Sequence, residues 1–332
     1  MATTSSLLAF DDFVTRIHAH CLVEAAAQLA PFIRVRYVQL ERGMACARGC
    51  AARMDRMSVG YVGADRHKVE CLDVPRGRVL IVVPTRGRAR LGTSTVERGR
   101  AIVAQGPTEL SLYTDREYQA TFVSILDRGV GEFIAPDPAA TRSARVRLLQ
   151  VAEPAIAAFD SCARRLTETK EASSDELLEV CEAWLRDEHD ENLTFAPSRA
   201  RCQAAIRARQ YIDEHLDRPL TLACVCQASY CSPRALEYGF REIFGVSPMA
   251  YMRCARLSRV RRELQCSAYT SGKITELAMK WGFWHLSQFS RDYCELFGEL
   301  PSITLGRACG RIDRGSYDCV EATTRIAVVA ER

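Results

Sequence analysis

Short runs of β-branched, aromatic and small apolar residues, separated by turn residues, dominate the chain from about Val35 to Leu126. Proline or glycine follows several of them, as at Pro84 and in the pair 106–107. The clearest runs are residues 79–83, 101–104, 109–113 and 120–126. Runs of this length with such punctuation predict the strands of an antiparallel barrel or sandwich.

The pattern changes at about residue 144. Residues 144–188 contain few glycines or prolines and carry apolar residues at helical spacing, which predicts helices. An acidic and then proline-bearing stretch follows, and a second helical region extends to about Leu305. We therefore expect an α+β protein. Its parts are a regulatory domain over residues 1–188, a linker over 189–205, an all-α domain over 206–306 and a tail over 307–332.

Residues 221–245 and 274–298 form an internal repeat. Each copy has a short apolar-patterned helix, a tight turn and a longer helix that ends in Phe-Gly. The Phe-Gly pairs at 244–245 and 297–298 are 53 residues apart, whereas the leading helices align better at an offset of 52. The second copy therefore carries one extra residue at its turn.

Local signals in both copies predict helix-turn-helix units. Ser232 can cap the second helix, and Pro233 suits its first position. Gly245 can end that helix, and Gly282 allows the sharp turn of the second copy. The expected buried positions are Leu236, Phe240, Ile243, Phe289, Tyr293 and Leu296.

Residues 248–264 predict one connecting helix between the two units, because the only proline stands at its start. An apolar stripe runs along it through Tyr251, Leu257, Val260 and Leu264. Its arginines are Arg253, Arg256, Arg259, Arg261 and Arg262. Phosphates or acidic surface partners are the contacts we expect for them.

Composition excludes several classes of protein. The chain is 48% hydrophobic and 26% charged, as in soluble globular proteins, and its net charge of +4 is only mildly basic. No apolar run reaches the length of a membrane span. The first sixteen residues lack the pattern of a secretory signal, so we expect a cytoplasmic protein that does not bind a membrane.

The 15 cysteines have irregular spacings, which favours reduced thiols in a cytoplasmic chain. Two clusters occur, Cys46 with Cys50 and Cys224 with Cys226 and Cys231. Neither supplies the four ligands of a typical zinc site, and His67 is the only histidine between His20 and His189. We therefore expect no metal, no cofactor and no catalytic residues.

The repeat and its connecting helix resemble the AraC/XylS family of bacterial transcription regulators. The motifs that carry the resemblance are RPLTL (218–222), SPRALEYGFREIFGVSPMAYMRCARL (232–257) and GFWHLSQFSRDYCELFGELPS (282–302). The resemblance covers about residues 207–306. It departs from the family at Tyr230 and Cys231, where glycine and a small apolar residue are usual, and at Glu237 and Tyr238, where Gln and Arg are common.

By resemblance, the two longer helices enter adjacent major-groove segments of double-stranded DNA. The residues implied at that surface are Ser232, Arg234, Glu237, Tyr238, Arg241, Leu286, Ser287, Ser290 and Arg291. Arg234 or Arg291 can pair bidentately with guanine, and Glu237 can accept a hydrogen bond from cytosine N4. Arg241 is better placed for phosphate.

The N-terminal half, through residues 79–126, resembles the cupin-like domain of the same family. The resemblance implies binding of an unidentified small effector, formation of a homodimer and contact with RNA polymerase. The expected function is a sequence-specific regulator, an activator. The alternative is a cysteine- or metal-dependent enzyme or redox sensor fused to a DNA-binding module.

Two groups of side chains have competing interpretations. Trp281, Phe283 and Trp284 could stack on bases, but their place at a helix turn favours core packing. Arg86, Arg88 and Arg90 alternate along an expected strand, which suits a solvent-facing edge better than a site for an anionic effector.

Overall fold

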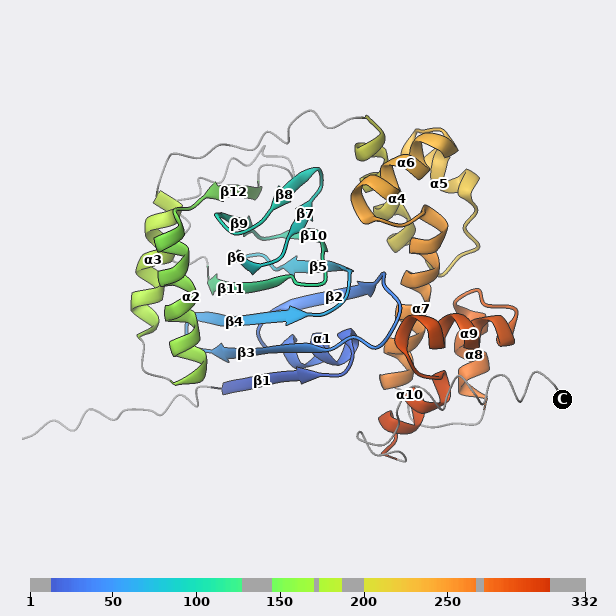
Figure 1. The fold of residues 1–332 in the computed structure, drawn as a ribbon, viewed down its shortest axis with the longest axis horizontal. Coiled ribbons are helices and arrows are strands. Elements are labelled where there is room, and N and C mark those ends of the chain that lie inside the picture. The colour runs from blue at the N-terminus through green and yellow to red at the C-terminus, as the bar shows by residue number, and fades with distance from the viewer. Residues whose placement is uncertain (1–12, 127–144, 170–172, 187–199, 267–271, 311–332) are drawn as a thin grey trace, which may run out of the picture.

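The computed structural model describes residues 13–126, 145–169, 173–186, 200–266 and 272–310. A domain of two antiparallel sheets is followed by an all-helical domain (Figure 1), so the predicted α+β fold is confirmed. Within these ranges, no helix combines the length and the apolar character that a membrane span requires.

The first domain contains all the strands of the described residues. They are β1 (Phe13–Ala19), β2 (Arg34–Gln39), β3 (Ala47–Arg53), β4 (Met57–Ala64), β5 (Lys68–Val74), β6 (Arg78–Arg86), β7 (Ala89–Leu91), β8 (Ser94–Val96), β9 (Arg100–Gln105), β10 (Thr108–Thr114), β11 (Gln119–Leu126) and β12 (Val146–Gln150). One sheet has the order β1-β3-β4-β11-β6-β9-β12 and the other β2-β5-β10-β7-β8.

The described helices divide between the two domains. Those of the first are α1 (Leu22–Leu29), α2 (Glu153–Glu168) and α3 (Ser174–Arg186). Those of the second are α4 (Ala200–Glu214), α5 (Leu222–Ser229), α6 (Pro233–Phe244), α7 (Pro248–Cys266), α8 (Lys273–Lys280), α9 (Leu286–Phe297) and α10 (Pro301–Ala308).

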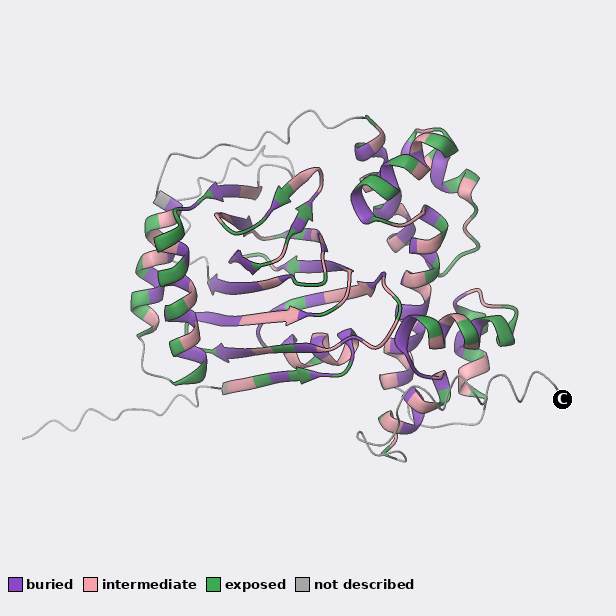
Figure 2. Ribbon diagram, viewed as in Figure 1, coloured by how far each residue is buried: buried purple, intermediate pink, exposed green. Residues whose placement is uncertain are grey.

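The sheets lie between α2 and α3 on one side and the helical domain on the other (Figure 1), and buried residues occur in the elements on both sides of each boundary (Figure 2). Helices α2 and α3 pack on the outer face of the seven-stranded sheet, and the five-stranded sheet covers its inner face. Strand β5 contacts the other sheet on one face and the helical domain on the other. Leu72 and Val74 point into the sandwich, whereas Val69 and Cys71, on the opposite face, join the core of the helical domain. One hydrophobic cluster therefore spans the boundary between the two domains.

Two expectations about the boundaries are corrected. Residues 146–150 form β12 and pair with β9 instead of opening a helix. Leu148 packs inside the sandwich while Leu149 packs under α2 and α3, so both faces of this short strand are apolar and its period is hidden.

The expected linker and tail also change. Residues 200–205 belong to α4, because Cys202, Ala204 and Ala205 are buried in the helical domain. Helix α10 runs two residues past the expected domain end at 306. Residues 189–199 and 311–332, the rest of the expected linker and tail, lie outside the described residues, and the domain division itself stays a prediction.

Candidate nucleic-acid interface

The first helix-turn-helix unit consists of α5, a tight turn and α6. The hydroxyl of Ser232 accepts a hydrogen bond from the amide of Ala235 at 3.3 Å, and Pro233 opens α6, as predicted. Gly245 ends α6 with φ 69°. In the turn, Tyr230 adopts the left-handed conformation, with φ 55° and ψ 46°, which glycine adopts more easily. The turn geometry is therefore retained in spite of the missing glycine.

Helix α6 separates its buried and exposed faces as expected. Leu236, Phe240 and Ile243 are buried. Arg234, Tyr238 and Arg241 are exposed, together with the cap Ser232 and beside a half-buried Glu237. The residues implied for DNA contact thus occupy an exposed edge.

Side chains on this edge already interact with one another. Arg241 donates to the carboxylate of Glu237 at 2.8 Å, and both side chains are partly exposed. The guanidinium of Arg234 lies 5.7 Å from the ring centre of Tyr238. Glu237 would therefore have to share its carboxylate between Arg241 and a cytosine, whereas Arg234 has its guanidinium on an open surface.

The second unit consists of α8, a longer turn and α9. Gly282 has φ 80° in the turn, and Gly298 ends α9 with φ 73°. The buried stripe is Phe289, Tyr293 and Leu296, as predicted. Leu286, Ser287 and Arg291 are exposed and Ser290 is half-buried, so this helix also presents an edge to solvent.

One expectation for the second turn is wrong. Trp281 is buried and Phe283 packs against the same core, which confirms core packing for these two residues. Trp284 instead has 71% of its surface exposed. The sequence predicted core packing for all three residues, because it does not show on which side of the turn the Trp284 indole lies.

Helix α7 connects the two units as one helix of 19 residues (Figure 1). At 1.5 Å per residue its length is about 28 Å. Successive major-groove segments on one face of B-DNA recur at about 34 Å. A helix of this length can therefore hold two reading units at a separation that suits adjacent segments.

The sequence predicts contacts with phosphates or acidic surface partners for the arginines of α7, but two of them are held within the protein. Arg261 is buried and forms an ion pair with Glu299 at 2.7 Å. Arg256 donates to the carbonyl oxygens of Leu216 and Arg218, and burial lowers its pKa. Arg253 is exposed and lies 3.6 Å from Asp292. Two arginines of α7 therefore serve the fold, one by neutralising a buried carboxylate and the other by donating to backbone carbonyl oxygens.

The sheet domain holds the carboxyl end of α6. Arg90 of β7 is exposed and donates a hydrogen bond to the carbonyl of Glu242. This contact accounts for Arg90 without an anionic effector. The hydroxyl of Tyr113 lies so close to Gly245 that a Cβ there would be 3.0 Å from it.

The sheet domain also holds the carboxyl end of α9. Gln39 is buried, and its side-chain nitrogen donates to the carbonyl of Leu296 at 2.6 Å. The amide of Gly43 donates to the carbonyl of Glu295 at 3.0 Å, and Arg42 forms an ion pair with the Glu295 carboxylate at 3.2 Å. These contacts fix both helices at their ends and leave their N-terminal edges exposed.

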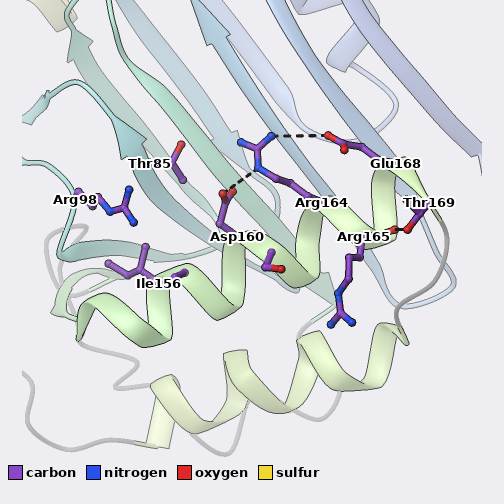
Figure 3. Close-up of a pocket in the computed structure, with 10 residues that line it drawn as sticks. Thr85, Arg98, Ile156, Asp160, Arg164, Arg165, Glu168 and Thr169 are labelled. Atoms are coloured by element: carbon purple, nitrogen blue, oxygen red, sulfur yellow. Dashed lines mark hydrogen bonds and ion pairs between the residues drawn. The ribbon is translucent and has the colours of Figure 1, made fainter.

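A cavity of about 330 Å³ lies far from this surface, beside α2 (Figure 3). The carboxylate of Asp160 accepts from Arg164 at 2.9 Å and from Thr121. Arg164 also lies 3.8 Å from Glu168, and Arg165 donates to Glu176 at 2.8 Å. The charged groups named here are therefore engaged with one another.

The first cysteine cluster, Cys46 with Cys50, lies at β3. Cys50 is buried and donates to the carbonyl of Thr167 at 3.3 Å, and Cys46 is half-buried. Burial raises the pKa of the Cys50 thiol. Among the described residues, no group of three or more His, Cys, Asp or Glu side chains could hold a metal ion.

Comparison with known proteins finds similarity in the helical domain. A family model described as a helix-turn-helix domain matches residues 225–307. The probable thc operon regulatory protein of Rhodococcus erythropolis is 32% identical over 116 residues, which are 35% of each chain. The XylDLEGF operon transcriptional activator of Pseudomonas putida is 38% identical over 103 residues, 31% of this chain and 32% of the relative. The chain thus spans about a third of the length of these relatives.

Solved structures differ in how much of the chain they match. A probable AraC family transcriptional regulator from Rhodopseudomonas palustris is 34% identical, with a TM-score of 0.29. The match spans 32% of this chain and 96% of the regulator's chain. ToxT from Vibrio cholerae covers 83% of this chain and 98% of its own at 12% identity and a TM-score of 0.32.

Proposed function

The chain belongs to the AraC/XylS family of helix-turn-helix transcription regulators, and from this membership we propose that it binds specific sequences in double-stranded DNA and activates transcription. The family is one of regulators, not of enzymes. The observation that carries the proposal is the pair of exposed edges on α6 and α9, joined by one continuous helix. Activation is supported by the relatives, among which are an operon activator and a positive regulatory protein of Yersinia pestis.

The exposed residues divide by the contact that each can make. Arg234 and Arg291 are the candidates for bidentate bonds to guanine, and Glu237 is the candidate for cytosine N4. Arg241 and the hydroxyl of Ser232 suit phosphate oxygens. The other proposed contacts come from Tyr238, Leu286, Ser287 and Ser290.

The sheet domain is the proposed sensor of a small effector. Its interior contains Lys68, only 1% exposed, with its ammonium 3.0 Å from the hydroxyl of Thr114 and 3.1 Å from the carboxylate of Glu70. The buried hydroxyl of Tyr118 has no partner among the described residues. Lys68 is satisfied by these two partners, but a buried hydroxyl without a partner is costly, so the Tyr118 hydroxyl is the group that favours this interior for ligand binding. Homodimer formation and contact with RNA polymerase complete the proposal.

Arg291→Ala tests base reading by the second unit. If Arg291 pairs with guanine, the substitution costs about 1–3 kcal/mol on the selected site and relaxes preference at one base position. The measurement is Kd on duplexes selected from a random library by the full-length protein, with each base varied in turn. The control is Arg34→Ala on β2, where the side chain is 71% exposed in the other domain and no change is expected.

An equal loss on every sequence would instead make Arg291 a phosphate contact. Failure of the protein to enrich any duplex in the selection would contradict the proposed function itself.

A further inference from the structure

The two helix-turn-helix units present different chemistry at equivalent positions. At the 53-residue offset, two arginines, a glutamate and a tyrosine of α6 correspond to two serines, an arginine and a cysteine of α9. The equivalent pairs are Arg234 and Ser287, Glu237 and Ser290, Tyr238 and Arg291, and Arg241 and Cys294. At these positions α6 therefore carries long side chains, three of them charged. Three of the four equivalent side chains of α9 are short and uncharged.

Apolar side chains take the place of charge on the second unit. Trp284 is 71% exposed and Leu286 is 37% exposed, and residues 284–288 are all exposed. Their equivalents in the first unit are Cys231, which is half-buried, and Pro233. The second edge thus combines two exposed apolar groups, small hydroxyl groups and the single cation Arg291.

This combination matches one feature of duplex DNA. The C5 methyl of thymine is the apolar group that base pairs present in the major groove. Short serine side chains allow the backbone of α9 to approach the base edges closely. Side chains at the start of the helix, such as Leu286, are then within reach of a methyl group.

A second observation favours DNA over an apolar protein surface as the partner. Helix α9 begins at Leu286, and its N-cap residue His285 makes no side-chain capping hydrogen bond, whereas Ser232 caps α6. The first amide groups of an uncapped helix lack internal partners and can donate to a phosphate. A phosphate contact there would place Trp284 and Leu286 beside the groove.

From these observations, and resting on the proposed function, we infer that Trp284 and Leu286 recognise thymine methyl groups in the DNA segment bound by the second unit. The first unit, with Arg234 and Glu237, recognises polar base edges. The binding site is therefore asymmetric in composition, with thymines concentrated in one of its two segments.

Substitution of deoxyuridine for thymine tests the inference, because it removes only the methyl group. The duplex is one selected from a random library by the full-length protein, and thymines are replaced one at a time. We expect one or two replacements to weaken wild-type binding about three- to tenfold, all within the segment where Arg291→Ala acts. Leu286→Ala is expected to bind the thymine and deoxyuridine duplexes equally at one such position, and Trp284→Ala at another.

Tyr238→Ala is the matched control, since Tyr238 is 53% exposed on the first unit. This variant should keep the wild-type preference for thymine in the second segment. Both test residues are exposed, and circular dichroism spectra like that of the wild type would show that the variants fold.

Two results would overturn the inference. One is wild-type binding that no deoxyuridine replacement changes. The other is a Trp284→Ala variant with unchanged Kd on every duplex but lost activation of a reporter gene, which would assign this surface to RNA polymerase. Either result leaves DNA binding itself intact, whereas failure to select any duplex would contradict the proposed function.

Discussion

Replacement of Glu299 by alanine is expected to lower the free energy of unfolding of the helical domain by about 3–5 kcal/mol. Glu299 lies between α9 and α10, and its side chain is 5% exposed. One carboxylate oxygen accepts from Arg261 of α7 and from Thr304, each at 2.7 Å, and the other accepts from Arg307 of α10. The carboxylate therefore joins the connecting helix to the second unit.

The expected loss is large because the arginine stays behind. Arg261 has a side chain only 4% exposed, stacked 4.6 Å from the ring centre of Phe297. Two of its nitrogens already lack partners among the described residues. Without Glu299, this cation has no neutralising group in the interior, and a buried unpaired charge is far more costly than a missing surface pair.

Calorimetry on the full-length protein measures the effect. The transition that includes the helical domain should fall by roughly 10 °C or more, given about 4–8 °C per kcal/mol for a domain of this size. Glu276→Ala is the control, because Glu276 is 66% exposed and pairs with Lys273 at the surface. A loss for Glu299→Ala no larger than that of the control would contradict the role assigned to this carboxylate.

The affinity for the selected duplex is expected to fall about 10³-fold between 50 and 200 mM salt. Each phosphate that a cation neutralises releases counterions and adds about −0.9 to the slope of log K against log salt, so about six contacts give this loss. The exposed basic residues of the helical domain are Arg207, Arg218, Arg234, Arg241, Arg253, Lys280 and Arg291.

Fluorescence anisotropy on a labelled duplex, at several salt concentrations, gives the slope. Arg34→Ala should leave the slope unchanged, and substitution of a phosphate-contacting arginine should reduce it by about 1. A slope between 0 and −1 for the wild type would be incompatible with two units bound along one duplex.

Local signals in the sequence predicted most of the helical domain. The repeat, the cap at Ser232, the glycine at 245 and the buried stripe through Phe240 follow from contacts a few residues apart, and the structure confirms them. The same holds for the strands between residues 79 and 126. Strand β1, which lies before Val35, was not predicted, because Arg16 and His18 interrupt its apolar pattern.

Features that depend on distant contacts could not be predicted. Gln39 and Leu296 are 257 residues apart, and nothing near either residue signals their hydrogen bond. Arg261 resembles its neighbouring arginines in sequence, but the fold places Glu299 beside it. Exposure of Trp284 likewise depends on how α8 and α9 pack. The sequence therefore predicted the reading units well, but not how the sheet domain holds them.

Hydroxyl-radical footprinting of the full-length protein on the selected duplex tests the central claim most directly. The account predicts two protected segments on one face of the DNA, centred about one helical turn, or 10–10.5 base pairs, apart. A single protected segment, or two segments on opposite faces, would contradict an arrangement in which α7 holds two helices in adjacent major-groove segments.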